Sequence, residues 1–168
     1  MDLVYGLDHS YQTDQVWQLS NKSSLTEYSA IMRLAKLPRP IQVQYPHDEA
    51  MLRRTLHRAD FLWIMQGEGI RDILGYLALT LLPWQNTACI TSLAVAPAAR
   101  RKKVATQLLR AANEQARSEG MHSVTGDVPT RNHPATRLYQ ACGFKFTGYA
   151  ENYYSAHDIA LLFASKIR

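Results

Sequence analysis

The sequence has little of what marks secreted, membrane-spanning or metal-binding proteins. Its 168 residues include two cysteines, Cys89 and Cys142, which are too distant to form a C-x-x-C pair. Such isolated cysteines favour reduced thiols in a cytoplasmic protein and suggest neither a disulfide framework nor a thiolate metal site. No apolar run approaches the roughly 18 residues of a membrane span, and the first residues lack the basic-then-apolar order of a secretion signal. We therefore expect a cytoplasmic location, no membrane and no metal.

The chain also lacks internal repeats, low-complexity tracts and an inter-domain linker. Hydrophobic residues make up 46% and charged residues 20% of the sequence, as in ordinary soluble globular proteins. A chain of this length is long enough to bury a core without disulfides or metals. One domain over residues 1–168 is therefore the expectation.

The charge is biased toward the positive sign. Lysine and arginine number 19 against 14 aspartate and glutamate residues, so the formal net charge is +5. This excess favours anionic partners, either nucleic acid or a phosphorylated cofactor, although it is also compatible with a surface charged only for solubility. No recognisable nucleic-acid-binding motif is present, so we expect no nucleic-acid partner.

Apolar periodicity predicts alternating strands and helices along the chain. Strands are expected over residues 15–19, 25–37, 41–46, 61–66, 73–82, 88–95, 123–128, 144–149 and 158–165. Helices are expected over residues 47–59, 101–118 and 134–141. The segment 25–37 also has helical propensity, and we expect Pro38 and Pro40 to end it.

The order of these elements indicates the fold class. Consecutive strands joined by short turns pair antiparallel. The strand–helix–strand unit over residues 88–128 instead makes one parallel strand pair with a right-handed crossover. We therefore expect an α/β (α+β) protein with a mixed, mostly antiparallel sheet and one parallel strand pair, on which the helices pack.

The most informative segment, LAVAPAARRKKVATQLLR, runs from Leu93 to Arg110. It combines a buried strand, a proline, a basic turn and an amphipathic helix. A helix start presents free N–H groups and the positive end of a dipole, which together bind anions. The four cations from Arg100 to Lys103 are unfavourable to the helix unless an anion offsets them. We interpret the turn as a diphosphate site; the alternative is a solvated basic corner.

Two linked motifs resemble those of the GNAT acetyltransferase superfamily. The first, V-x-P-x-x-R/Q-x-x-G-x-G/A-x-x-L, is represented by Val95, Pro97, Arg100, Lys103, Val104, Ala105 and Leu108. The second, N-x-x-A-x-x-L-Y-x-x-x-G-F, is complete as Asn132, Ala135, Leu138, Tyr139, Gly143 and Phe144. Two positions depart from the family: Lys103 replaces a loop glycine, and Thr91 stands where many relatives carry a glutamate. The resemblance covers residues 61–167.

The resemblance implies a GNAT-like mixed sheet with helices on both faces. It also implies acetyl-CoA as co-substrate and direct attack by an amine in a ternary complex. The phosphates would contact the turn, and the pantetheine would pair with the preceding strand. The expected cofactor-binding residues are Leu93, Ala94, Val95, Arg100, Arg101, Lys102, Lys103, Val104, Ala105, Thr106, Asn132, Ala135 and Tyr139. Pairing of two chains into a homodimer, as in many relatives, is a further expectation.

Acetyl transfer to an amine requires an acid for the departing thiolate and a base for the amine. Tyr139 is the candidate acid, since a phenol can donate a proton; the alternative is a packing residue. Asp127 is the candidate base, and its alternative is a turn or cap residue. His133, His122 and an ordered water are other candidate bases. Glu151 and the run Asn152-Tyr153-Tyr154 are candidates for the acceptor side.

The acceptor is suggested by the C-terminal segment AENYYSAHDIALLFASKI. It is similar to the tail of streptothricin acetyltransferases and also to the NYY segment of ribosomal-protein N-terminal acetyltransferases. Our leading expectation is an N-acetyltransferase for a primary amine of a small molecule, with residues 1–46 as a divergent acceptor-side segment. The alternatives are a protein N-terminal or lysine acetyltransferase, and a non-catalytic acyl-CoA sensor suggested by Lys103 and Thr91.

Overall fold

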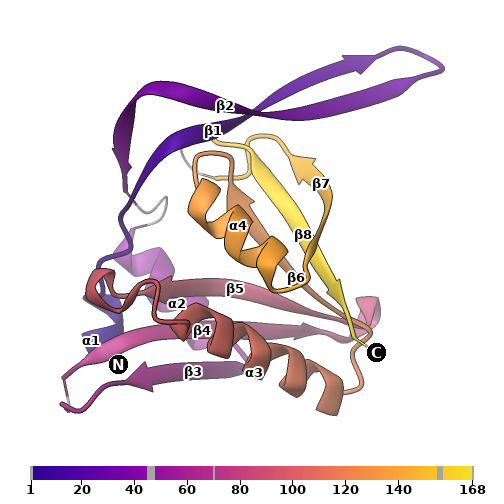
Figure 1. Ribbon diagram of the computed structural model, residues 1–168. Coiled ribbons are helices and arrows are strands. Elements are labelled where there is room, and N and C mark those ends of the chain that lie inside the picture. The colour runs from indigo at the N-terminus through magenta and orange to yellow at the C-terminus, as the bar shows by residue number, and fades with distance from the viewer. Residues whose placement is uncertain (1, 45–47, 70, 155–156, 168) are drawn as a thin grey trace.

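The computed structural model describes residues 2–44, 48–69, 71–154 and 157–167. A six-stranded sheet with the order β3-β4-β5-β6-β8-β7 forms the body (Figure 1). Its strands are β3 (Phe61–Gln66), β4 (Ile73–Leu82), β5 (Thr87–Val95), β6 (Ser123–Pro129), β7 (Lys145–Ala150) and β8 (Ala160–Lys166). Among these strands β5 and β6 pair parallel, and every other neighbouring pair is antiparallel. The predicted fold class is therefore confirmed.

Helices cover both faces of this sheet, as expected. Helices α3 (Val104–Ser118) and α4 (His133–Ala141) follow β5 and β6, whereas α1 (Asp2–Tyr5) and α2 (Glu49–Arg58) belong to the first part of the chain. Alternation along β4 separates two hydrophobic cores. Leu77 and Leu79 join the core under α3 and α4, and Tyr76 and Ala78 join the core under α1 and α2.

The helix ends follow from local backbone chemistry. Helix α2 begins one residue after Asp48, whose side chain accepts a hydrogen bond from the Met51 N–H and caps it. Helix α3 begins at residue 104 and not at the predicted residue 101. Arg101 and Lys103 have φ values of 63° and 64°, which lie outside the helical region, so residues 100–103 form a turn.

Residues 11–43 form a separate antiparallel ribbon of β1 (Tyr11–Ser23) and β2 (Tyr28–Val43). Strand structure over the segment 25–37 is confirmed from residue 28 onward. The predicted break at Pro38 and Pro40 is wrong, because β2 continues through both. The pairing register shifts between Thr13 and Gln15, so the prolines lie opposite an irregularity where no ladder N–H is needed. The end of the predicted strand 41–46 and the first residue of the predicted helix 47–59 lie outside the described residues.

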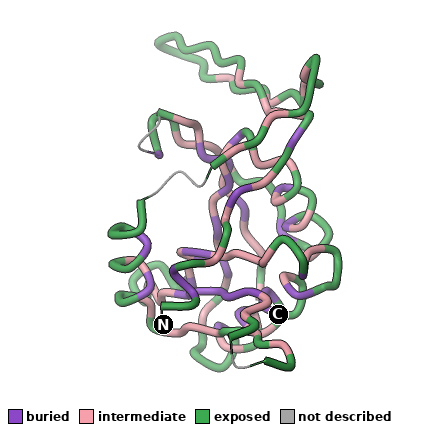
Figure 2. The backbone as a smooth tube through the Cα atoms, turned by 90° about the vertical axis from the view of Figure 1, so that its left-hand side faces the viewer, coloured by how far each residue is buried: buried purple, intermediate pink, exposed green. Residues whose placement is uncertain are grey.

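The ribbon lies across α4 and the β7–β8 end of the sheet, and its tip extends beyond β7 (Figure 1). The Trp17 backbone N–H donates to the Thr130 carbonyl at 3.0 Å, and its indole N–H donates to Thr136 at 3.3 Å. Farther out, Asn21 donates to Glu151 at 2.8 Å. Figure 2 shows the ribbon tip as largely exposed. The ribbon is therefore anchored at its base and free at its tip.

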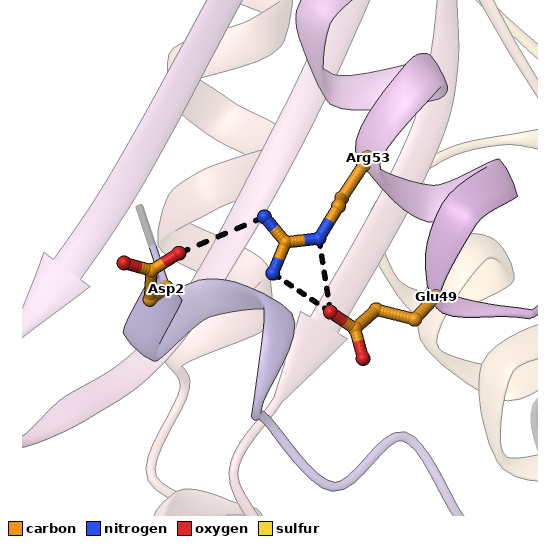
Figure 3. A network of polar contacts seen from close by, with 3 residues as sticks. All are labelled: Asp2, Glu49 and Arg53. Atoms are coloured by element: carbon orange, nitrogen blue, oxygen red, sulfur yellow. Dashed lines mark hydrogen bonds and ion pairs between the residues drawn. The ribbon is translucent and has the colours of Figure 1, made fainter.

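A polar network joins α1 to α2 (Figure 3). Arg53 donates to one carboxylate oxygen of Glu49 at 2.7 and 2.9 Å, and its other nitrogen lies 3.6 Å from Asp2. Its guanidinium also stacks 4.0 Å from the ring centre of Tyr5. Exposed ion pairs contribute little, so burial of Val4 and Tyr5 is the main force that holds α1 in place.

Candidate active site

The site begins where β5 and β6 separate. Their parallel pairing runs from Thr87 opposite Ser123 to Ile90 opposite Gly126 and stops there. Thr91 is an extra residue on β5, because the pairing with β4 shifts at this point. A bulge of this kind bends a strand and increases its twist. Among the described strands, the last part of β5 therefore has a partner on its β4 side and none on its β6 side.

A cavity of about 500 Å³ occupies this gap. It is lined by β5, the turn before α3, β6, α4 and the start of the N-terminal segment. It reaches both faces of the sheet: Val104 and Tyr139 belong to the core under α3 and α4, whereas Ser92 contacts Tyr76 of the opposite core. Two molecules that approach from opposite faces can therefore meet in it.

The cavity brings together most of the cofactor-binding residues predicted from the sequence. Those that line it are Leu93, Ala94, Val95, Arg100, Arg101, Val104, Ala105, Asn132, Ala135 and Tyr139. The predicted residues outside the lining are Lys102, Lys103 and Thr106. These three belong to the turn and the first helical turn, where a backbone N–H is the group that a phosphate would use.

The turn before α3 has the backbone geometry of an anion site. Lys103 holds φ 64° and ψ 11° as the N-cap of α3, and no side chain caps the helix. Its first N–H groups are therefore available, together with the positive end of the helix dipole. A left-handed conformation costs an L-residue about 1–2 kcal/mol, which explains why the family motif has glycine here. The lysine keeps the loop shape at that cost.

Arg100 is engaged with the N-terminal segment. Its Nε donates to the Val95 carbonyl at 3.1 Å, and its Nη2 donates to the carbonyls of Ser10 at 2.6 Å and Asp8 at 3.4 Å. The guanidinium thus ties the end of β5 to the chain that leads into β1. Arg101 also lines the cavity, and no such carbonyl contact of its guanidinium is found among the described residues.

Tyr139 is buried and also lines the cavity. Its ring packs edge-on against Phe144, with centroids 4.9 Å apart, and obliquely against Phe163 at 5.7 Å. Burial raises the pKa of its phenol far above the usual value, and the nearby carboxylate of Asp127 adds to the effect. The phenol is therefore neutral at physiological pH and carries a proton that it can donate. Tyr139 can therefore both pack in the core and donate a proton.

Asp127 lines the cavity from β6 and accepts two phenol hydrogen bonds. Tyr154 donates to one carboxylate oxygen, and Tyr153 donates to the other at 3.3 Å. Burial and the facing carboxylate raise the pKa of Tyr153 to about 12 and that of Tyr154 still further. Both phenols therefore remain donors, and the NYY segment is brought to the candidate base.

The other candidates lie away from the cavity. His133 contacts Thr136 and packs against Trp17, and its ring is outside the cavity lining. His122 precedes β6, at the opposite end of that strand from Asp127, where its backbone bonds Asn86 and Ile167. Glu151 is hydrogen-bonded to the ribbon. Of the candidate bases named from the sequence, Asp127 is the side chain that faces the cavity.

Sequence reasoning missed part of the site. His9, Tyr11 and Ser92 line the cavity, and buried Tyr76 links two of them. The His9 Nε2 lies 2.8 Å from the Tyr76 hydroxyl, which lies 2.9 Å from the Ser92 hydroxyl. The Tyr11 hydroxyl is buried with no hydrogen-bond partner in the described part of the chain. A signal was present in β4, because Tyr76 is a phenol in the apolar run ILGYLALTLL.

Two negative findings complete the site. Within residues 2–44, 48–69, 71–154 and 157–167, three or more histidine, cysteine or acidic side chains do not gather where they could bind a metal. No helix formed by the described residues has the length and apolarity needed to cross a membrane.

Comparisons with known proteins agree with this geometry. Residues 28–144 match the Acetyltransferase (GNAT) family. The chain is 31% identical over 150 residues to a streptothricin acetyltransferase of Streptomyces lavendulae, covering 88% of this chain and 77% of the relative.

Solved structures share the fold. A nourseothricin acetyltransferase has a TM-score of 0.84 and 21% identity, covering 99% of this chain and 92% of its own. A Bacillus anthracis protein described as a putative streptothricin acetyltransferase in complex with acetyl coenzyme A has a TM-score of 0.73 and 19% identity. That match covers 96% of this chain and 90% of its own. The chain thus belongs to the acetyltransferase (GNAT) family and is an acetyl-CoA-dependent N-acetyltransferase.

Proposed function

We propose that the protein transfers the acetyl group of acetyl-CoA to a primary amine of a small molecule, directly, within a ternary complex. One observation carries the proposal: a single cavity connects the basic turn on one face of the sheet with Asp127 and Tyr154 across the gap between β5 and β6. Its volume of about 500 Å³ is in the range of small-molecule sites. Donor and acceptor can occupy its two ends together, so no acetylated side chain is needed.

The donor end has the parts that acetyl-CoA requires. The diphosphate would accept hydrogen bonds from the free N–H groups at the start of α3, and Arg101 supplies charge beside them. The pantetheine arm would pair with Leu93–Val95, since β5 has no strand partner on that side. This path leads the thioester to Asn132 and Tyr139, which line the cavity from α4 and its cap.

The acceptor end is built for a cationic group. Asp127 supplies a carboxylate that two phenols hold in place, so it can receive the ammonium form of an amine and remain beside it through the transfer. Once the ammonium has lost a proton, attack of the neutral amine on the carbonyl forms the C–N bond, and backbone N–H groups of β5 would stabilise the oxyanion. The C–S bond then breaks, and Tyr139 donates a proton to the departing thiolate.

The preference for a small acceptor rests on the relative and on the wall of the site. The relative that is 31% identical is a streptothricin acetyltransferase, and the match spans most of both chains. His9 and Tyr11 of the N-terminal segment line the cavity, and Arg100 ties this segment to β5. We therefore propose a streptothricin-like small amine as the acceptor class.

The test is thiol release from acetyl-CoA with a panel of acceptors. The panel contains streptothricin, simple diamines, amino acids, a lysine-rich peptide and an alanine-initiated peptide. Release with streptothricin or another small amine at least tenfold above both peptides supports the proposal. A strong preference for a peptide overturns the acceptor class, and acetyl-CoA binding without release for any acceptor favours an acyl-CoA sensor.

A further inference from the structure

Three side chains, two with a hydroxyl and one with an imidazole, form a line of hydrogen bonds that starts at the cavity wall. Ser92 lines the cavity from β5, one residue after the bulge. Its hydroxyl lies 2.9 Å from the Tyr76 hydroxyl, and that hydroxyl lies 2.8 Å from the His9 Nε2. Tyr76 is fully buried and Ser92 nearly so, so both hydrogen bonds lie in a region shielded from bulk water.

The three groups have the properties of a proton relay. A serine or tyrosine hydroxyl can accept one proton while it donates another, and a neutral imidazole accepts at its unprotonated nitrogen. Burial lowers the pKa of His9 below its ordinary value, so the ring is neutral at physiological pH. A hydrogen bond with the backbone of Leu7 opposes this shift. This contact is consistent with a proton on Nδ1, in which case Nε2 accepts from the Tyr76 hydroxyl.

The far end of this line of hydrogen bonds has an outlet. His9 lines the main cavity and also a second cavity of about 280 Å³. The charged groups around the ring are Asp8, which favours the imidazolium, and Arg100, which disfavours it. Asp48, the N-cap of α2, and Glu49 at the start of that helix line the second cavity as well. A proton that reaches His9 therefore arrives beside carboxylates at the edge of the molecule.

We infer that Ser92, Tyr76 and His9 form the relay that removes the proton from the acceptor amine during acetyl transfer. The bound ammonium first passes one proton to the Ser92 oxygen, which frees the nitrogen lone pair to form the bond to the carbonyl carbon. The Ser92 proton moves to Tyr76, and the Tyr76 proton moves to the His9 Nε2. The C–S bond breaks, Tyr139 protonates the thiolate, and the second proton of the nitrogen restores the Tyr139 phenol. The imidazolium later releases its proton to water.

This assignment rests on the proposed reaction at the same cavity and divides the work between two groups. Asp127 holds the acceptor, and its two carboxylate oxygens already accept hydrogen bonds from two phenols. His9 is then the group that gains the proton. Thr91, where many relatives carry a glutamate, also lines the cavity, and its hydroxyl donates to the Ala78 carbonyl at 3.4 Å.

The experiment compares Ser92→Ala, Tyr76→Phe, His9→Ala and His9→Gln with the wild type, using the best acceptor found in the panel. Each relay variant is expected to lose kcat by about 10²-fold, the usual contribution of a general base, with the KM for acetyl-CoA within twofold. The acidic limb of the kcat profile, which His9 sets, should disappear in Tyr76→Phe. Ser165→Ala and Tyr149→Phe are matched controls on β8 and β7, and circular dichroism and melting temperature verify folding.

Rescue of kcat by added imidazole distinguishes a role of His9 in proton transfer from a purely structural role. Added imidazole should restore kcat of His9→Ala at least fivefold through the second cavity, and it should not restore Ser92→Ala, because the inner step is then missing. Ser92→Thr keeps the hydroxyl and should retain most activity. The relay is overturned if Ser92→Ala and Tyr76→Phe keep kcat within twofold, if their pH profiles match the wild type, or if imidazole leaves His9→Ala unchanged. A peptide as best acceptor overturns the small-molecule proposal and leaves the relay test intact.

Discussion

The hydroxyl of Tyr139 occupies the space beside Gly126 that a larger residue on β6 would need. A Cβ atom added at position 126 would lie 2.6 Å from this hydroxyl and 2.8 Å from the ring. Gly126 is also the last β6 residue paired with β5. The phenol therefore reaches the point where the two strands separate only because this position has no side chain.

This relationship predicts the effect of Gly126→Ala. The methyl group should push the phenol out of its position, so we expect kcat to fall at least tenfold while the KM for acetyl-CoA stays within threefold. Tyr139→Phe, which removes only the hydroxyl, should lower kcat by about 10²-fold. Steady-state thiol release measures both. Wild-type kcat in Tyr139→Phe would remove the residue from its role as the acid.

The loop lysine gives a stability prediction. Lys103 has a left-handed backbone, which glycine adopts without strain. Lys103→Gly should raise the free energy of unfolding by roughly 0.5–1 kcal/mol, since relief of strain exceeds the added freedom of the unfolded chain. Lys103→Ala is the matched control, because alanine keeps the strain. Urea unfolding measures both, and equal stability of the two variants would contradict the assignment.

The two arginines of the turn should have different functions, Arg100 in stability and Arg101 in acetyl-CoA binding. Arg100→Ala removes charged hydrogen bonds to Val95 and Ser10 and should lower the free energy of unfolding by about 1.5–3 kcal/mol. Arg101→Ala should leave stability nearly unchanged and raise the KM for acetyl-CoA, with a weaker salt dependence than the wild type. Denaturant unfolding and kinetics at two salt concentrations test the pair. The reverse pattern would exchange the two roles.

Asp127 gives a prediction about the acceptor. Asp127→Asn keeps the size of the side chain and removes its charge, so the KM for a cationic acceptor should rise at least tenfold. The KM for acetyl-CoA should change little, since the donor end lies across the gap. Asp60→Asn is a matched control on an exposed aspartate outside the cavity. An unchanged acceptor KM in Asp127→Asn would contradict its role as the ammonium partner.

Alkaline pH should reveal the shielded phenols. Burial raises the pKa of Tyr11, Tyr139, Tyr153 and Tyr154, the value for Tyr153 being about 12. The unfolded chain releases these protons near pH 10 and the folded chain does not, so stability is full below about pH 10 and falls above it. Absorbance at 295 nm should show that these phenols ionise at a higher pH than the other tyrosines of the chain, or only when the protein unfolds. Tyr154→Phe should reduce the loss of stability.

The elements of the sheet were predictable because their side-chain patterns are local. Alternation or apolar runs identified every strand from β3 onward, and caps such as Asp48 and Asn132 lie where the sequence has them. The ribbon was less predictable. Proline usually ends a strand, and only the register shift opposite Pro38 and Pro40 lets β2 continue. The helix start at residue 104 likewise depends on two left-handed residues that sequence patterns alone do not reveal.

The sequence by itself determined the family, the strands and helices from residue 61 onward, the basic turn and the place of Tyr139 in its motif, because each depends on residues close together in the chain. Tertiary structure alone decided what faces the cavity. It brought His9, Tyr76 and Ser92 into one line of hydrogen bonds and placed Tyr153 and Tyr154 on Asp127. It also turned Arg100 toward Ser10. These contacts join residues 16 to 90 positions apart, and their geometry arises only when the sheet and the N-terminal segment pack together.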